Sequence, residues 1–70
     1  MTRMFGNVLK EKREEKGYTL YKLSELSGLS YIQINNLENG KNKPNASTIS
    51  KLAKALNCSY EELFELTIND

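Results

Sequence analysis

Apolar residues recur at intervals of three and four along the chain, the spacing that places them on one face of an α-helix. No stretch alternates apolar and polar residues well enough to predict a strand. In the first predicted helix, about residues 4–16, Phe5, Leu9 and the stem of Arg13 share one face. Gly17 follows in the position where glycine commonly ends a helix. The pattern therefore predicts an all-α fold.

A second, short helix is predicted between Thr19, which can cap its start, and Gly28, which ends it. Its inward face is expected to hold Leu20, Leu23 and Leu26. Only residues 27–30 separate it from the next helix, so the two helices must cross steeply. Gly28 permits a positive φ at the turn, and Ser24 is small enough for the helices to touch. These are the features of a helix-turn-helix, here about residues 19–39.

Three further helices complete the pattern. Ser30 opens the first, with Gln33 three residues later as in a capping box. After a basic loop, Asn45 can cap the second, and Ser59 with Glu62 forms another capping-box pattern at the start of the last. The apolar positions of these helices are Ile34, Leu37, Ile49, Leu52, Ala53, Leu56, Leu63, Phe64 and Leu66. The expected architecture is one compact domain of five short helices over residues 1–70.

The composition of the chain argues against several classes of function. The chain has 70 residues, 39% of them hydrophobic, and no apolar run near the roughly 18 residues that a membrane span needs. It has no histidine, and Cys58 is its only cysteine, so we expect no metal site, no cofactor and no internal disulfide. A single cysteine fits a reducing cytoplasm. Without an evident base, Cys58 is better interpreted as a small, semi-buried residue than as a nucleophile.

Acidic pairs do not indicate catalysis either. In Glu14–Glu15 and Glu61–Glu62 the two residues are adjacent, so they point about 100° apart on a helix and do not flank one site. We therefore expect a non-enzymatic protein, with no evident small-molecule ligand.

Charge is distributed unevenly, although the formal net charge is only +1. Residues 1–56 hold ten bases and five acids, which sum to +5, whereas residues 57–70 hold four acids and no base, which sum to −4. Between residues 39 and 56 there are four lysines and no acid. A basic body with an acidic end suggests a polyanion on one side and another partner on the other. Chance clustering on a solvated surface remains the alternative.

Four motifs stand in register along the chain: RxxKG at residues 13–17, LSxxSGLS at 23–30, IxxLENGK at 34–41 and IxxLAKAL at 49–56. With these motifs the sequence resembles the lambda-repressor-like helix-turn-helix family of phage Cro and repressor proteins. The resemblance extends from Phe5 to Leu63. It implies a five-helix DNA-binding domain in which the third helix enters the major groove.

The resemblance implies four base-reading positions: Tyr31, Ile32, Asn35 and Asn36. Asparagine suits adenine, isoleucine can lie against a thymine methyl group, and a tyrosine hydroxyl can reach a base or a phosphate. Ile32 lies about 200° of helix rotation from the core residue Ile34, which favours a position outside the core. The sequence does not distinguish between an exposed and a half-buried position for Tyr31.

Phosphate contacts are expected where backbone N–H groups and lysines converge. The candidates are Thr19, Tyr21, Lys22, Ser30, Gln33, Asn39, Lys41, Asn42 and Lys43. Lys41 and Lys43 could instead be ordinary solvated loop charges, the role we expect for Lys51 and Lys54. Leu20 stands where the family commonly has a glutamine that bonds a phosphate, and Tyr21 is a candidate for part of that role.

The resemblance also implies an ion pair between Arg13 and Glu38, with two separate exposed charges as the alternative. The C-terminal helix and tail, residues 59–70, are a candidate dimerisation element. The expected interface residues are Cys58, Tyr60, Phe64, Leu66 and Ile68. Alternatively, Phe64 and Leu66 complete the core of the monomer.

The sequence thus predicts a transcriptional regulator, a repressor that binds a palindromic operator in double-stranded DNA as a homodimer. A protein-interaction module, such as an antitoxin, and a restriction-modification controller are the alternatives.

Overall fold

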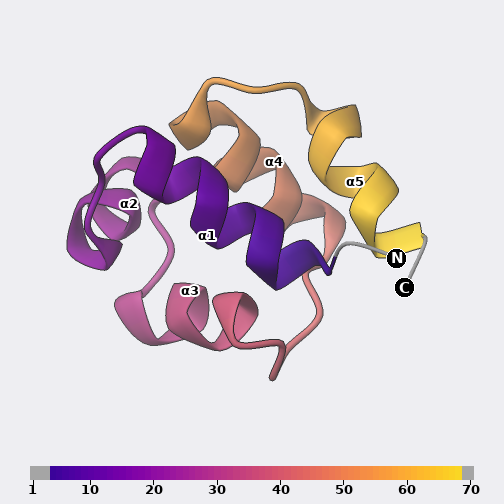
Figure 1. Cartoon of the computed structure of the whole chain (residues 1–70), viewed down its shortest axis with the longest axis horizontal. Coiled ribbons are helices and arrows are strands. Elements are labelled where there is room, and N and C mark those ends of the chain that lie inside the picture. The colour runs from indigo at the N-terminus through magenta and orange to yellow at the C-terminus, as the bar shows by residue number, and fades with distance from the viewer. Residues whose placement is uncertain (1–3, 69–70) are drawn as a thin grey trace.

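The computed structural model describes residues 4–68, and this part of the chain contains five α-helices and no strand. The helices are α1 (Phe5–Glu15), α2 (Leu20–Ser27), α3 (Tyr31–Glu38), α4 (Ala46–Leu56) and α5 (Tyr60–Ile68). Helices α1 and α4 lie on either side of the core, α2 and α5 lie at opposite ends, and α3 lies along one edge (Figure 1). The predicted all-α fold is confirmed. Among the described residues, none of the helices is long and apolar enough to cross a membrane.

The predicted caps explain where the helices begin. The side chains of Thr19, Ser30 and Asn45 accept hydrogen bonds from backbone N–H groups at the third positions of α2, α3 and α4. Ser59 does the same at α5, by accepting from the N–H of Glu62. The reciprocal half of both predicted capping boxes was wrong. Within residues 4–68 neither the Gln33 nor the Glu62 side chain bonds back to the N–H of its capping serine, and the Glu62 carboxylate accepts a hydrogen bond from Lys12 instead.

The core draws on all five helices. Leu9, Leu23, Ile34, Leu52 and Leu63 are fully buried, one from each helix. The other apolar residues of the cluster are Phe5, Leu29, Leu37, Ile49, Ala53 and Leu56. The hydrophobic spacing of the sequence therefore identified most of the core.

Leu26 was predicted to face inward but is exposed. The buried face of α2 is formed by Leu23 and Ser27. At 100° per residue, Leu26 lies about 80° from the centre of that face. Ser27 lies on that face because it follows Leu23 by one turn, and its hydroxyl accepts a hydrogen bond from the backbone N–H of Leu29 at 3.2 Å.

The joint between α2 and α3 has the geometry that the sequence predicts for a helix-turn-helix. Gly28 has φ +79°, which permits the sharp change of direction after α2. The hydroxyl of Ser24 donates a hydrogen bond to the carbonyl of Leu29, so this small side chain ties α2 to the turn that leads into α3. Residues 24–29 thereby hold α3 at a fixed angle to α2.

A second close approach joins α1 to the end of α3. Gly6 is buried, and a Cβ atom placed on it would lie 2.5 Å from the carbonyl oxygen of Leu37 and 2.6 Å from that of Glu38. Real Cβ atoms do not approach backbone oxygens so closely, so only glycine fits here. Hydrophobic spacing alone does not identify this role of Gly6. A signal was present, because glycine inside a helical pattern is unfavourable and indicates a packing reason.

Candidate nucleic-acid interface

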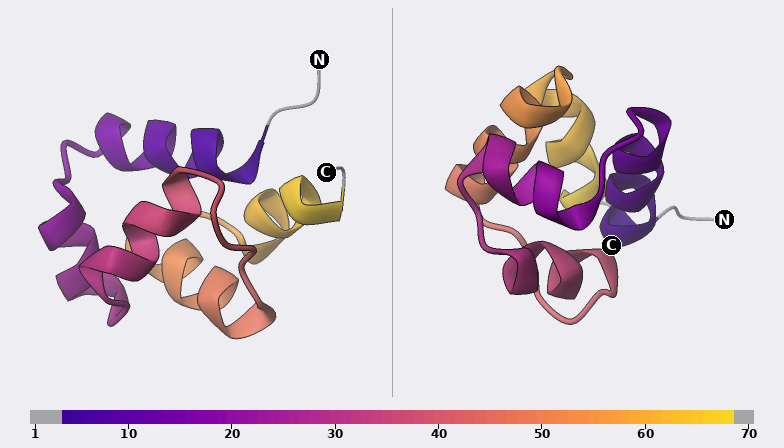
Figure 2. Two further views of the ribbon diagram at one scale, coloured as in Figure 1. Left: turned by 90° about the horizontal axis from the view of Figure 1, so that it is seen from below. Right: turned by 90° about the vertical axis from the view of Figure 1, so that its left-hand side faces the viewer.

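Helix α3 and the elements beside it form one face of the molecule. Seen from below, α3 crosses the front of the molecule, with α2 beside its start and the loop to α4 continuing from its end (Figure 2, left). Helix α5 lies away from this face in all three views (Figures 1 and 2). The face therefore brings together the predicted base-reading helix, the start of α2 and the basic loop.

The side chains of α3 divide into a buried and an open side. Ile34, Leu37 and Glu38 are buried. Ile32, with 68% of its surface exposed, lies outside the core as predicted. Asn35 and Asn36 are half-buried at the edge of the open side. Asn35 accepts a hydrogen bond from the side chain of Asn39 at 3.3 Å, whereas the Asn36 side chain has no hydrogen-bond partner within residues 4–68.

Tyr21 and Tyr31 stack on each other at the starts of α2 and α3. Their ring centroids are 4.6 Å apart and the rings are inclined by 26°. Tyr21 is 72% exposed and Tyr31 is 36% exposed. Of the two positions considered for Tyr31, exposed and half-buried, the structure therefore shows the exposed one. Leu20 packs against the core beside them. The stack thus occupies the surface next to the position where the family commonly has its glutamine.

The starts of α2 and α3 carry the polar phosphate candidates. The first N–H groups of a helix have no partner within the helix and form a partial positive charge. Thr19 and Ser30 are exposed, and their hydroxyl oxygens accept the capping bonds from Lys22 and Gln33 at 3.0 Å. Lys22 is also paired with Glu25 at 3.1 Å on the surface of α2. The N-terminal ends of α2 and α3 could therefore bind anions, although Glu25 partly neutralises the positive charge of Lys22.

The loop after α3 is basic and anchored at its start. The backbone N–H of Lys41 donates to the carbonyl of Asn36 at 2.9 Å, so the loop begins in a fixed position. Asn39, Lys41, Asn42 and Lys43 are all exposed. On α4, Lys51 and Lys54 are exposed as well, as predicted.

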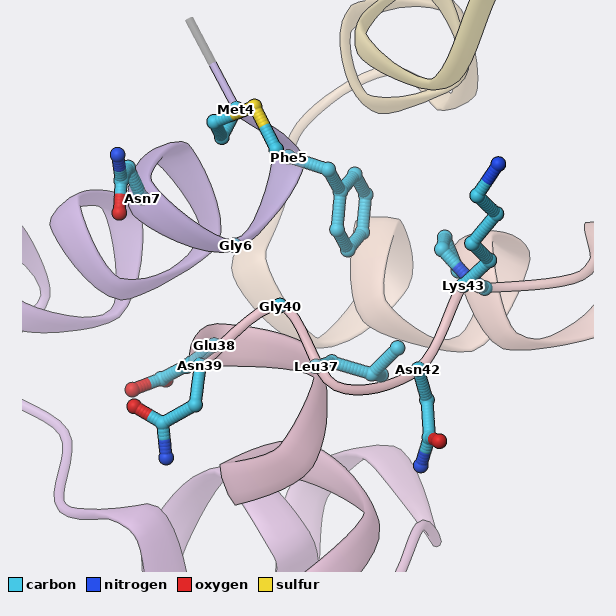
Figure 3. A pocket seen from close by; sticks show the side chains of 11 residues that line it. Met4, Phe5, Gly6, Asn7, Leu37, Glu38, Asn39, Gly40, Asn42 and Lys43 are labelled. Atoms are coloured by element: carbon cyan, nitrogen blue, oxygen red, sulfur yellow. The ribbon is translucent and has the colours of Figure 1, made fainter. Parts of the chain in front are cut away.

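A pocket of about 400 Å³ separates this loop from the start of α1. It is lined by residues 4–7, 37–40 and 42–44. Phe5 points into the pocket, whereas the side chain of Asn42 points away from it (Figure 3). Phe5 and Leu37 form an apolar floor that belongs to the core cluster. The loop thus spans a hollow, which leaves Asn42 and Lys43 on the surface.

Arg13 and Glu38 form the predicted ion pair, and the alternative of two separate exposed charges is wrong. Arg13 Nε donates to Glu38 Oε2 at 2.7 Å and Nη2 donates to Oε1 at 3.1 Å. The remaining Nη1 donates to the carbonyl of Tyr18 at 2.7 Å. The hydrogen bond with Glu38 raises the pKa of Arg13 above its ordinary value, although burial of the guanidinium lowers the pKa in part. The pair ties α1 to the last turn of α3.

The α5 surface combines apolar and acidic side chains. Phe64 is 39% exposed and stacks on Tyr60 with ring centroids 5.5 Å apart. Tyr60, Cys58 and Leu66 are half-buried against the core, so Leu66 helps to complete the monomer whereas Phe64 remains at the surface. The side chain of Ile68 lies outside the described residues.

Electrostatics at this end of the molecule centre on Lys12. Its ammonium group pairs with Glu62 at 3.1 Å, and this hydrogen bond raises the pKa of Lys12. Burial raises the pKa of the nearby Cys58 thiol, so the neutral thiol is favoured there. In the part of the chain that the structure describes, the His, Cys, Asp and Glu residues do not form a group of three or more that could hold a metal ion.

Comparison with known proteins supports this organisation. The profile of the helix-turn-helix family HTH_3 matches residues 9–63. No curated protein sequence matches the chain. Among solved structures, the restriction-modification controller protein C.AhdI from Aeromonas hydrophila is 38% identical, with a TM-score of 0.82. That match covers 86% of this chain and 91% of the controller.

Two other structures are similar. The P22 c2 repressor, solved in complex with synthetic operator 9T, is 27% identical with a TM-score of 0.82, over 89% of this chain and 94% of the repressor. The restriction-modification controller C.Esp1396I is 28% identical with a TM-score of 0.78, over 91% of this chain and 82% of the controller. From its sequence and its fold, this chain belongs to the helix-turn-helix family, in the lambda-repressor-like group of DNA-binding domains.

Proposed function

We propose that the protein is a sequence-specific regulator of transcription that binds double-stranded DNA without catalysing a reaction, in the cytoplasm. The observation that carries this proposal is the single face on which the open side of α3, the starts of α2 and α3, and the basic loop meet. The same fold in the P22 c2 repressor was solved on a synthetic operator.

In this mechanism α3 enters the major groove. Tyr31, Ile32, Asn35 and Asn36 then contact base edges, because the first residues of the second helix of a helix-turn-helix reach the bases. The starts of α2 and α3 and the loop contact phosphates, which set the position of α3 on the duplex but carry no direct sequence information. The proposed phosphate contacts are Thr19, Tyr21, Lys22, Ser30, Gln33, Asn39, Lys41, Asn42 and Lys43.

We further propose that the protein binds a palindromic operator as a two-fold symmetric dimer. One α3 reads only a few base pairs, whereas a dimer places two such helices about 34–36 Å apart, one turn of DNA. If the α3 face lies on DNA, the interface must use another surface. The acidic α5, with Phe64 at its surface, is unsuited to phosphate and is the proposed interface. Tyr60, Cys58 and Leu66 would border Phe64, and Ile68 would extend the contact.

A role as a restriction-modification controller is the second candidate. It is favoured by the 38% sequence identity with C.AhdI over 86% of this chain. Repressor and controller would share the same DNA-binding face and would differ in the operators that they bind. Identification of the operator therefore tests both.

The decisive experiment is selection of bound sequences from a random pool of DNA duplexes by the full chain. We expect a palindromic consensus, and an affinity for it that falls steeply with salt concentration because phosphate contacts release counterions. A protein that shows no sequence preference and no salt-dependent binding to duplex DNA would refute the proposal, and would favour a protein-interaction module instead.

A further inference from the structure

We propose that the pocket between the start of α1 and the loop after α3 binds a small organic carboxylate that carries one aromatic ring or a branched alkyl group of similar size. The pocket measures about 400 Å³, within the range of ligand sites in proteins. It is formed by residues 4–7 together with residues 37–40 and 42–44, which only the fold brings together. No spacing in the sequence therefore predicts it.

The walls of the pocket are held in place by contacts within the protein. Gly6 brings α1 against α3, where a Cβ atom would lie only 2.5 Å from the carbonyl oxygen of Leu37. The loop is anchored at both ends, by the hydrogen bond of 2.9 Å from the N–H of Lys41 to the carbonyl of Asn36 and by the fixed φ of Pro44. A ligand would enter a preformed site, so its binding would cost little ordering of the protein.

The interior of the pocket is apolar. The ring of Phe5 points into it (Figure 3), and Leu37 contributes to its floor. Met4 lies at the rim and is 49% exposed, although its side chain is apolar. The apolar group of a ligand would cover these side chains and displace the water that contacts them, which is favourable. Ligand pockets in proteins combine such a lining with a few polar groups that fix the orientation of the ligand.

Lys43 supplies the polar group that fits a carboxylate. Its side chain extends from the loop beside the Phe5 ring (Figure 3), and its ammonium group has no ion pair or hydrogen bond within residues 4–68. Glu38 also lines the pocket, but its carboxylate is bound by Arg13. The last carbonyl groups of α3 carry a partial negative charge. The carboxylate of a ligand would therefore lie at Lys43, with the apolar group toward α3.

Occupation of the pocket would weaken DNA binding, a step that rests on the proposed function. Lys43 is one of the proposed phosphate contacts. A carboxylate paired with its ammonium group would neutralise this charge and repel a phosphate beside it. Ligand and DNA would then each lower the affinity of the protein for the other by the same factor. A small organic acid would thus favour release of the protein from its operator.

The first test is a titration of the full chain with phenylacetate, without DNA, followed by amide chemical shifts in NMR spectra. We expect shifts at residues 4–7 and 37–44, and a dissociation constant in the millimolar range, typical of a ligand of about ten non-hydrogen atoms. 2-Phenylethanol keeps the ring but lacks the charge, so it should bind about threefold more weakly, the effect of one exposed ion pair. Acetate, which lacks the ring, should not cause these shifts.

Two lysine variants test the orientation of the ligand. Lys43→Met removes the charge and keeps an apolar stem, so it should weaken the binding of phenylacetate about threefold and leave that of 2-phenylethanol unchanged. Lys41→Met is the matched control, because Lys41 is exposed in the same loop but does not line the pocket. With DNA present, saturating phenylacetate should lower the operator affinity of the wild-type protein relative to the same concentration of acetate, and this effect should be absent in Lys43→Met.

Several results would overturn the ligand site. These are unchanged shifts at residues 4–7 and 37–44, equal shifts with acetate, and an equal loss of phenylacetate affinity in Lys41→Met and Lys43→Met. Nuclear Overhauser contacts to Pro44 from residues 1–3 or from a second copy would also overturn it, because the protein itself would then fill the pocket.

Operator affinity that phenylacetate and acetate change equally would overturn the competition with DNA while the ligand site stands. If the protein binds no duplex DNA, the proposed function fails, whereas the titration without DNA still decides the ligand site. The two failures are therefore distinguishable.

Discussion

Arg13 on α1 and Glu38 on α3 are joined through two parallel hydrogen bonds, although 25 positions separate them in the chain. Glu38 is the last residue of α3, and the loop to α4 begins directly after it. Gly6 lies against the carbonyl oxygen of the same residue, so the end of α3 is held by α1 through an ion pair and a close backbone contact. Helix α1 therefore fixes the orientation of the proposed reading helix by contacting its buried side.

The ion pair should therefore contribute strongly to stability. Glu38→Gln or Arg13→Met leaves the other charge buried without its partner, so we expect each to lower the free energy of unfolding by about 3–5 kcal/mol. Urea denaturation measures this, with a double-mutant cycle for the coupling. Glu25→Gln, which breaks the exposed pair with Lys22, is the control and should cost less than about 1 kcal/mol. Two mild single variants without coupling would contradict the prediction.

Gly6→Ala should destabilise the protein despite the better helix propensity of alanine. The new Cβ would meet the backbone oxygens of Leu37 and Glu38, which cannot move without displacing α3. We expect a net loss of about 1–3 kcal/mol, typical of overpacking, measured by thermal or urea unfolding. Asn7→Ala is the matched control, because Asn7 is exposed in the same turn and alanine should be tolerated there. Equal stability of the two variants would show that α1 and α3 can separate freely.

Asn36→Ala should weaken binding to the selected operator by about 1–3 kcal/mol, the value of one good contact to a base, and leave binding to unrelated duplexes nearly unchanged. The Asn36 side chain has no hydrogen-bond partner within residues 4–68, so its removal should not disturb the fold. Titrations with both duplexes measure the difference. An equal loss on both would mean that Asn36 does not read a base.

Lys41→Ala and Lys43→Ala should weaken binding to all duplexes alike. Each lost phosphate contact should flatten the dependence of log affinity on log salt concentration by about 0.9. Lys51→Ala on α4 is the control, since Lys51 is exposed but predicted to face water. If the slopes of the loop variants equal that of Lys51→Ala, Lys41 and Lys43 are ordinary solvated charges.

Phe64→Glu should convert the proposed dimer into a monomer, because a charge in the centre of an apolar contact would be buried without a partner. Sedimentation at micromolar concentration measures the mass. Leu26→Glu is the matched control: Leu26 is also an exposed apolar residue, but it lies on α2. A wild-type protein that is monomeric, and still binds a palindromic site tightly without cooperativity, would contradict dimerisation through α5.

The sequence alone determined the helices and most of the core. Spacings of three and four located Leu9, Ile34 and Leu52, and the caps at Ser30 and Asn45 located helix starts. These features are local, because a helix and its cap are formed by residues within one or two turns of each other. The Arg13–Glu38 pair was predicted through the family resemblance, since periodicity placed Arg13 on a buried face but did not identify its partner.

Only the tertiary structure decided the remaining features, because they depend on contacts between segments far apart in the chain. Glu62 binds Lys12 of α1 rather than the start of its own helix. Helix α2 packs on the core through the face that holds Leu23 and Ser27, which leaves Leu26 exposed. Gly6 is required because the backbone of α3 lies against it. The stack of Tyr21 on Tyr31 exists because the helix-turn-helix brings the starts of two helices together. Hydrophobic spacing records which side of a helix is buried, whereas the identity of its neighbour depends on how the helices pack.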